Sequence, residues 1–249
     1  MRAYWTLVRR ELAGFFLSPS GYIIIAAALF LMGYSFVVIL VMLQKPTPMP
    51  VTELFYNTPF FWLILLLTTP VITMRLFAQE KFTGTFETLM TTPVSDVQVV
   101  AAKFSAALLF YILTWLPLVG CLLVVRHYTN EPGALDGGVV GSTFLGIVLL
   151  GALFVSLGCC ASALTRSQAI AAMISLGFGA SVFLLGYLAF RLPAQDTWQT
   201  QVLSCFDLFE QMRDFARGVV DTRPVVMLVS LTLFFLFLTL RVVESRRWK

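Results

Sequence analysis

The 249-residue chain is 59% hydrophobic and 12% charged, and its formal net charge is +4. Soluble domains average about 45–50% apolar and about 25% charged residues, so this composition excludes an ordinary soluble fold. The apolar runs reach the roughly 20 residues that cross a bilayer, and the basic residues stand at their ends instead of forming one patch, which argues against a nucleic-acid partner. We therefore expect an all-α membrane protein surrounded by lipid, with one domain over residues 1–249.

The first 21 residues predict a helix that lies along the membrane surface. An apolar stripe with helical spacing runs through them, formed by Trp5, Val8, Leu12 and Phe15. Arginines lie largely off this stripe, as is typical of an interfacial helix, and a Ser18–Gly21 turn is expected to end it. Residues 22–43 follow without a charge and form the first expected span, which is too long for the apolar core of a signal peptide.

Two further spans are expected before the middle of the chain. Residues 55–74 form the second span, which contains Pro59 and Pro70. Residues 104–125 form the third, and Pro117 is expected to kink it because proline lacks a backbone N–H.

The second half of the chain predicts three spans and one amphipathic helix. Residues 139–164 and 168–190 form spans four and five, and the short connection between them requires an antiparallel pair. Both are rich in glycine, alanine and serine, which either pack within one chain or meet a second copy. Residues 192–221 predict an amphipathic extracytoplasmic helix, and residues 224–240 form the sixth span.

The even number of spans places both termini on one side, and the charges indicate which side. With the termini, the connection between spans two and three, and Arg166 on the same side, most of the basic residues gather there, whereas most of the acidic residues fall on the other. Basic residues are enriched in cytoplasmic loops. We therefore expect a multi-pass protein of the cell (inner) membrane with both termini in the cytoplasm.

No catalytic or cofactor site is expected. The sequence has no G-x-x-x-x-G-K-[ST] loop for nucleotide phosphates, a single histidine, and four cysteines without metal-ligand spacing. No expected span carries Asp, Glu, Lys or Arg near its middle, whereas ion-coupled carriers bind ions or protons there. The chain is therefore expected to be no enzyme, to bind no metal or cofactor, and to use no proton or sodium coupling.

The connection between spans two and three, residues 74–104, is amphipathic and too polar for lipid. It is expected to contain a short helix ended by Thr92 and Pro93, with Ser95 or Asp96 capping the helix that follows. A solvated connection and a docking element for a soluble partner both fit this composition. The docking element would offer three apolar anchors, Phe86, Leu89 and Met90.

One pattern in this connection is specific. The stretch A-x-E-K-x-x-G-T-x-E-x-L-x-x-x-P-V-S-D-x-x-x-x-x-x-K-F, from Ala78 to Phe104, resembles the cytoplasmic coupling segment of ABC-2 type permeases. It is most similar to the subgroup of gliding-motility-associated and nitrous-oxide-reductase-maturation permeases. Residues 214–221 and 244–248 are similar to the same subgroup, and the resemblance extends over the whole chain.

The resemblance implies a dimer of permease subunits, two copies of one chain or two close homologues, bound to two copies of a separate ATPase subunit that holds ATP and Mg²⁺. The interfacial helix and the connection between spans two and three would be seated on that ATPase. An auxiliary extracytoplasmic protein is a further implied partner. The residues that match the coupling motif are Glu80, Lys81, Gly84, Thr85, Phe86, Glu87, Leu89, Thr92 and Pro93. A second, minor contact with the ATPase is expected at Thr165, Arg166, Ser167 and Gln168.

The expected function is that of a membrane-spanning permease in an ABC exporter. Two other functions remain open. One is a non-transporting membrane scaffold that recruits a cytosolic protein through the same connection. The other is a small secondary carrier, which the charge-free spans disfavour.

Overall fold

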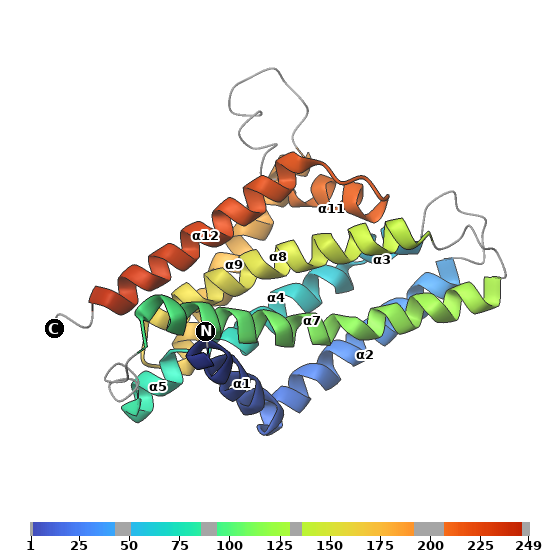
Figure 1. Cartoon of the computed structure of the whole chain (residues 1–249). Helices are drawn as coiled ribbons and strands as arrows, with labels where there is room; N and C mark the ends of the chain where they lie inside the picture. The colour runs from blue at the N-terminus through green and yellow to red at the C-terminus, as the bar shows by residue number, and fades with distance from the viewer. Residues whose placement is uncertain (1, 43–50, 86–93, 130–135, 192–206, 246–249) are drawn as a thin grey trace, which may run out of the picture.

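The computed structural model describes residues 2–42, 51–85, 94–129, 136–191 and 207–245 (Figure 1). These residues form helices and no strands, which confirms the predicted all-α class. In this part of the chain, six helices are long and apolar enough to cross a membrane: Pro19–Val41, Pro59–Thr83, Asp96–Val125, Gly137–Leu164, Gln168–Ala189 and Thr222–Ser245. The predicted six-span organisation is thereby confirmed.

The helices follow one another in a simple order along the chain. They are α1 (Arg2–Phe16), α2 (Pro19–Met42), α3 (Val51–Asn57), α4 (Pro59–Thr73), α5 (Ala78–Thr83), α7 (Asp96–Thr129), α8 (Gly137–Leu164), α9 (Gln168–Arg191), α11 (Leu208–Ala216) and α12 (Thr222–Ser245).

The bundle has two different ends (Figure 1). One end, termed the α5 end, carries α1, α5 and the last turn of α12. The opposite end, termed the α11 end, carries α3, α11 and the first turn of α8. Helix α8 runs between the two ends and contacts α4, α7, α9, α11 and α12. Its apolar stretch is 72% buried, against 17% for α12, so α8 is the central helix of the bundle.

Helix α1 packs along α7. Two residues of its predicted stripe, Val8 and Phe15, are buried, and the ring of Phe15 stacks on that of Phe110 with a centroid distance of 4.7 Å. Trp5, from the same stripe, is exposed. Part of the apolar face that was predicted to lie on lipid therefore packs against protein.

The connection between the first two helices is shorter than predicted. Helix α1 ends at Phe16 and α2 begins at Pro19, so residues 17–18 form the connection instead of the Ser18–Gly21 turn. Proline suits the first position of a helix, because its missing N–H would have no partner there.

Pro59 divides the expected second span. Helix α3 is a separate short helix, and α4 begins at Pro59 rather than at residue 55. Between them, Thr58 has an extended backbone (φ −73°, ψ 141°), and its hydroxyl donates a hydrogen bond to the Phe55 carbonyl at 2.7 Å. The predicted start of this span was wrong because Phe55 and Tyr56, which belong to α3, were counted with the apolar residues that follow the break.

Helix α7 extends beyond the expected span 104–125 at both ends. The Ser95 hydroxyl oxygen accepts from the backbone N–H of Gln98 at 3.3 Å, as expected of a capping residue. Pro117 lies within α7 without ending it. Lys103, which the sequence placed in the connection ahead of the span, lies inside this helix.

Two glycines of α8 allow neighbouring helices to approach closely. A Cβ atom added at Gly151 would lie 2.0 Å from the ring of Tyr111 in α7, and one added at Gly158 would lie 2.1 Å from the hydroxyl oxygen of Thr73 in α4. Both positions therefore require glycine. Of the two explanations for the small residues in span four, packing within one chain applies to these two.

The expected amphipathic segment 192–221 contains α11, while its residues 192–206 lie outside the described part of the chain. The carboxylate of Asp207 accepts from the backbone N–H groups of Phe209 and Glu210 at 3.1 and 3.0 Å and so caps the start of α11. The last span, α12, is longer at both ends than the expected 224–240.

Candidate functional site

The connection that resembles a coupling segment begins with a turn at residues 74–77 and continues as α5. Helix α5 ends at Gly84, whose φ of 74° lies in the left-handed region that glycine favours. The Thr83 hydroxyl donates to the Gln79 carbonyl at 3.1 Å. The sequence E-K-x-x-G therefore forms a short helix with a defined end.

The last turn of α8 holds the start of α5. The Ser162 hydroxyl oxygen accepts from the backbone N–H groups of Phe77 and Ala78, each at 3.1 Å, and donates to the Met74 carbonyl at 3.3 Å. A serine on another helix thus satisfies backbone donors that the first turn of α5 leaves without intrahelical partners. Lys81 Nζ donates to the Ala163 carbonyl, at the C-terminal end of α8, where a positive charge is favoured.

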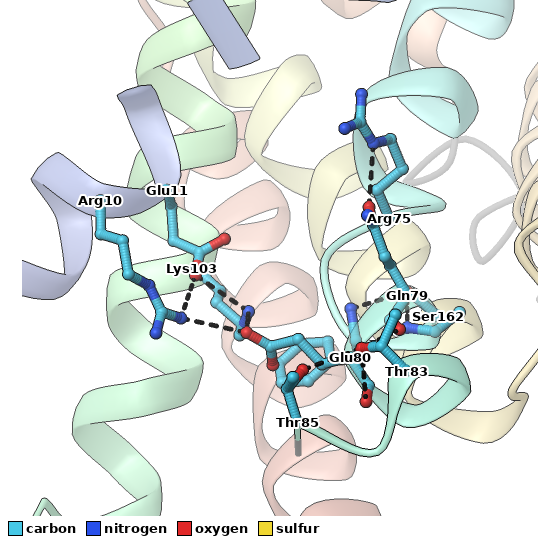
Figure 2. A network of polar contacts seen from close by, with 11 residues as sticks. Arg10, Glu11, Arg75, Gln79, Glu80, Thr83, Thr85, Lys103 and Ser162 are labelled. Atoms are coloured by element: carbon cyan, nitrogen blue, oxygen red, sulfur yellow. Dashed lines mark hydrogen bonds and ion pairs between the residues drawn. The ribbon is translucent and has the colours of Figure 1, made fainter. Parts of the chain in front are cut away.

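A cluster of four charged residues joins α5 to α1 and α7, and is termed the Glu80 cluster (Figure 2). Glu80 Oε1 lies 2.9 Å from Lys103 Nζ and 3.0 Å from Arg10 Nη2. Glu11 Oε1 lies 3.1 Å from Lys103 Nζ and 2.6 Å from Arg10 Nη2. The Lys103 side chain is only 2% exposed, and its ammonium also lies 5.4 Å from the centre of the Phe77 ring.

The Glu80 cluster contains two carboxylates and two cations, so its formal charges balance. Burial by itself would raise the pKa of Glu11, but the positive charge of Lys103 and the hydrogen bond from Arg10 outweigh burial and hold that pKa below its ordinary value. Glu11 is therefore a stable anion at neutral pH. The cluster acts as an ionic joint between three helices.

Arg75, in the turn before α5, connects that turn to the corner between α1 and α2. Its Nη1 donates to the hydroxyl of Ser18 at 2.7 Å and also to that of Ser20, and its Nε donates to the Gln79 side-chain oxygen at 3.1 Å. A cavity of about 270 Å³ lies between Arg75 and the Glu80 cluster. The α5 end thus brings α1, the corner before α2, α5 and α7 together through polar side chains.

A second ion cluster lies at the α11 end and joins α3 to α11. The Glu53 side chain is 2% exposed, and its oxygens lie 3.2 Å from Arg213 Nε and 2.9 Å from Arg217 Nη2. The Thr52 hydroxyl donates to the Ala216 carbonyl at 2.8 Å, and the Tyr56 hydroxyl donates to the carbonyl of Phe209. Helix α3, whose last residues were expected to belong to span two, is therefore bonded along its length to α11.

Among the described residues, no group of three or more His, Cys, Asp or Glu side chains is placed to hold a metal ion. Residues 35–243 match the family described as ABC-2 family transporter protein, which is well over half of the chain.

The chain belongs to the ABC-2 transporter family.

No curated protein matched the chain in a sequence comparison. An ABC-2 protein is the membrane-spanning component of an ABC transporter and is not itself the catalytic subunit, and the family implies an ATP-binding partner subunit. The matched range contains Glu53, Glu80 and Lys103, whereas Arg10 and Glu11 precede it.

Part of the predicted coupling site of this ABC-2 protein is described by the structure. Glu80 and Lys81 lie on α5, and Gly84 and Thr85 follow it directly. The other predicted residues of the segment lie outside the described part of the chain: Phe86, Glu87, Leu89, Thr92 and Pro93, together with Met90 of the predicted anchors.

The predicted second contact lies at the turn between α8 and α9. Thr165 and Ser167 form this turn, with the backbone N–H of Ser167 donating to the Thr165 hydroxyl oxygen at 3.1 Å, and Gln168 is the first residue of α9. Arg166 is exposed at the same turn. Helix α5 contacts both α8 and α9, so the two predicted coupling regions are neighbours at the α5 end.

Several residues that build this site were given no role there on the basis of the sequence. Arg10, Glu11, Lys103 and Ser162 all bond to α5 or to its partners, although they lie far from it in the sequence. Of these, Lys103 stands near the end of the stretch that resembles the coupling segment, and a lysine next to a long apolar run needs a partner if the helix begins before it.

Proposed function

We propose that this ABC-2 protein is the permease subunit of an ABC exporter in the cell (inner) membrane, with both termini and the α5 end in the cytoplasm. The bias of basic residues toward that side supports the orientation. One observation carries the proposal. Helix α5, at the start of the segment that resembles a coupling element, is bonded to α1 and α7 through Glu80 and to α8 through Ser162.

A helix bonded in this way can transmit force from a partner subunit to the membrane spans. ATP and Mg²⁺ would be bound by the partner subunit, because this sequence has no phosphate-binding loop of the G-x-x-x-x-G-K-[ST] type. When nucleotide draws two such subunits together, a push on α5 reaches α7 through Lys103 and α8 through Ser162 and the Ala163 carbonyl. The tilt of these spans then changes without any ion binding inside the membrane.

The proposal includes a second permease subunit, a copy of this chain or a close homologue, since the path for the substrate would run between two permeases. The A-x-E-K-x-x-G-T pattern from Ala78 supports the gliding-motility and nitrous-oxide-reductase-maturation subgroup. An auxiliary extracytoplasmic protein would then approach the α11 end.

The decisive experiment is to purify the tagged permease from membranes with its bound proteins and reconstitute the complex in lipid vesicles. We expect an ATP-binding subunit to be retained and its ATP hydrolysis to rise when the permease is present. Glu80→Gln is expected to reduce this stimulation several-fold, because the variant weakens the ionic joint between α5 and α7.

The matched control is Glu244→Gln, which neutralises a glutamate that, among the described residues, forms an ion pair with the exposed Arg241 three residues away. This variant is expected to behave like the wild type. A retained partner whose ATP hydrolysis never responds to the permease would contradict the exporter and favour the scaffold. Retention of a cytosolic protein that binds no ATP would likewise favour the scaffold, and retention of no cytosolic protein at all would contradict both.

A further inference from the structure

Arg75 carries a positive charge that pairs with no carboxylate in the described part of the chain. Its Nε and Nη1 donate to three neutral groups: the side-chain oxygen of Gln79 and the hydroxyls of Ser18 and Ser20. Its Nη2 is accessible and forms no hydrogen bond to the described residues. The neighbouring Glu80 cluster balances its own charges, with two carboxylates and two cations. One guanidinium therefore has a charge and a donor left for a ligand.

The cavity of about 270 Å³ at the α5 end is lined by this guanidinium. Its walls also include two further cations, Arg10 and Lys103, and two carboxylates, Glu11 and Glu80. Three cations against two carboxylates leave one formal positive charge. Pockets for drug-sized ligands occupy about 300–1,000 Å³, so this cavity is suited to a smaller group. Size and charge together favour a single anionic group.

The corner that holds Arg75 also presents apolar side chains to the outside. Leu17, at the connection between α1 and α2, is 85% exposed, and Tyr22 and Ile23 in the first turns of α2 are exposed as well. Arg75 follows Thr73, the last residue of α4, by two positions. Arginine and tyrosine at the ends of membrane spans reach the level of the lipid headgroups. The guanidinium thus lies where spans begin and end, beside apolar side chains without a cover in this chain.

We propose that this cavity binds the phosphate of an anionic phospholipid. Arg75 Nη2 donates to a phosphate oxygen, and the single negative charge of the phosphate diester offsets the surplus positive charge of the cavity. The acyl chains lie against the exposed apolar residues of the corner, Leu17, Tyr22 and Ile23. Basic pockets beside membrane helices bind anionic headgroups by the same chemistry. This ligand site is independent of the ATP-binding subunit.

A soluble phosphate is the other source of the same chemistry. It would accept from the same nitrogen of Arg75, but it would leave the apolar side chains of the corner uncovered. Burial of apolar surface is the larger contribution for a lipid, at about 0.8 kcal/mol per CH₂ group. The observations therefore favour the lipid over the free anion.

The test titrates three probes onto the delipidated full-length permease in detergent and measures bound probe by native mass spectrometry. The probes are phosphatidylglycerol, phosphatidylcholine and glycerol 3-phosphate. Phosphatidylglycerol should bind about ten- to hundredfold more tightly than phosphatidylcholine, whose quaternary ammonium cancels the charge of the phosphate. Glycerol 3-phosphate should bind more weakly than phosphatidylglycerol, because it has no acyl chains.

Arg75→Gln should remove the preference for phosphatidylglycerol, since the cavity loses its surplus charge. Arg9→Gln is the matched control: it removes an exposed arginine of α1 that does not line the cavity, and it should keep the preference. The melting temperature of each variant without added lipid shows whether the fold is intact.

Gly14→Leu tests the cavity without removing a polar group. Gly14 lines the cavity, and a Cβ atom there meets nothing within 4 Å, so the new side chain adds bulk at the wall. Binding of phosphatidylglycerol should fall several-fold, while the melting temperature without lipid stays equal or rises, because leucine favours helix over glycine. Gly33→Leu in α2, where a Cβ atom is equally unobstructed, is the control and should bind as the wild type does.

The inference is overturned if phosphatidylcholine binds as tightly as phosphatidylglycerol. It is also overturned if Arg9→Gln weakens binding as much as Arg75→Gln, because surface charge in general would then explain the preference. Equal binding of glycerol 3-phosphate and phosphatidylglycerol would replace the lipid by a soluble anion. Unchanged binding in Gly14→Leu would contradict the cavity, and this variant decides the question if Arg75→Gln does not fold.

Discussion

Lys103 Nζ lies 2.9 Å from Glu80 Oε1 and is buried, although it stands at the start of a long apolar helix. A buried ammonium group is tolerated when carboxylates surround it, and here Glu11 is the second partner at 3.1 Å. The ion pair joins α5 to α7, the next described helix along the chain. The position of α5 is therefore coupled to a membrane-spanning helix by one ionic contact.

Replacement of Lys103 by methionine should destabilise the permease strongly. The variant keeps the length of the side chain but leaves two carboxylates with Arg10 as their remaining cation, and breaking a buried pair costs about 3–5 kcal/mol. Thermal unfolding in detergent measures the loss. The double variant Lys103→Met/Glu80→Gln should recover part of the stability. Arg241→Gln, at an exposed pair, should change it by less than about 1 kcal/mol.

The ion cluster of Glu53, Arg213 and Arg217 predicts the relative effects of three variants on the attachment of α11. Arg217 approaches Glu53 through two nitrogens, at 3.0 and 2.9 Å, whereas Arg213 approaches through one at 3.2 Å. Arg217→Gln should therefore loosen α11 more than Arg213→Gln, because it removes two hydrogen bonds to the carboxylate instead of one. Glu53→Gln should loosen α11 as well, since both arginines lose their carboxylate.

Hydrogen exchange of residues 208–216 measures this effect. The three variants should accelerate exchange in α11 and leave exchange in α5 unchanged, because α5 lies at the other end of the bundle. Equal exchange for Arg213→Gln and Arg217→Gln would show that the second nitrogen contact adds nothing.

Substitution of Gly151 or Gly158 by alanine should destabilise the bundle. The added methyl groups would lie 2.0 Å from Tyr111 and 2.1 Å from Thr73, and overpacking of this kind costs about 1–3 kcal/mol or more. Gly141→Ala is the control on the same helix, because a Cβ atom there meets nothing within 4 Å. It should be neutral or stabilise by up to about 1 kcal/mol. Thermal unfolding of the three variants checks this order.

The stability of the α5 end should depend on acid. The folded-state pKa of Glu11 is below its ordinary value of 4.5, so the stabilisation is fully present above about 4.5 and is lost as pH falls through the lower folded value. The melting temperature should fall with pH in that window. Glu11→Gln should have a lower melting temperature at neutral pH and a smaller drop, and an identical drop in both proteins would contradict the assignment to Glu11.

The orientation predicts the behaviour of reporter fusions. Alkaline phosphatase fused after Lys249 should be inactive, because it remains in the cytoplasm, whereas a fluorescent protein at the same place should fluoresce. Phosphatase fused after Thr129, at the end of α7, should be active. An active phosphatase after Lys249 would reverse the proposed orientation and remove α5 from the reach of a cytoplasmic ATPase.

The six spans were predictable because a helix that crosses a bilayer needs a long apolar run. Such a run is visible in a single sequence. The boundaries were less predictable. Pro59 separates α3 from α4 inside the expected span 55–74, and α7 starts well ahead of its apolar stretch. Hydrophobicity alone does not distinguish a membrane span from a helix that is covered by other helices.

The site was predictable only where its residues are close in sequence. Glu80 and Lys81 were found through a motif, but the motif did not predict the bonds that both form within the chain. Their partners Arg10, Lys103 and Ala163 come from three different helices. Contacts between such distant residues depend on how the helices pack. That packing cannot be read from a single sequence.

Two serines of α8 bond other elements at opposite ends of the molecule. Ser162 bonds the first turn of α5, and Ser142 donates to the Phe215 carbonyl in α11 at 2.7 Å. The twenty residues between them correspond to about 30 Å of helix. Helix α8 thus carries, near each of its ends, a serine hydroxyl that bonds another helix. A shift of α8 along its axis therefore displaces α5 and α11 together.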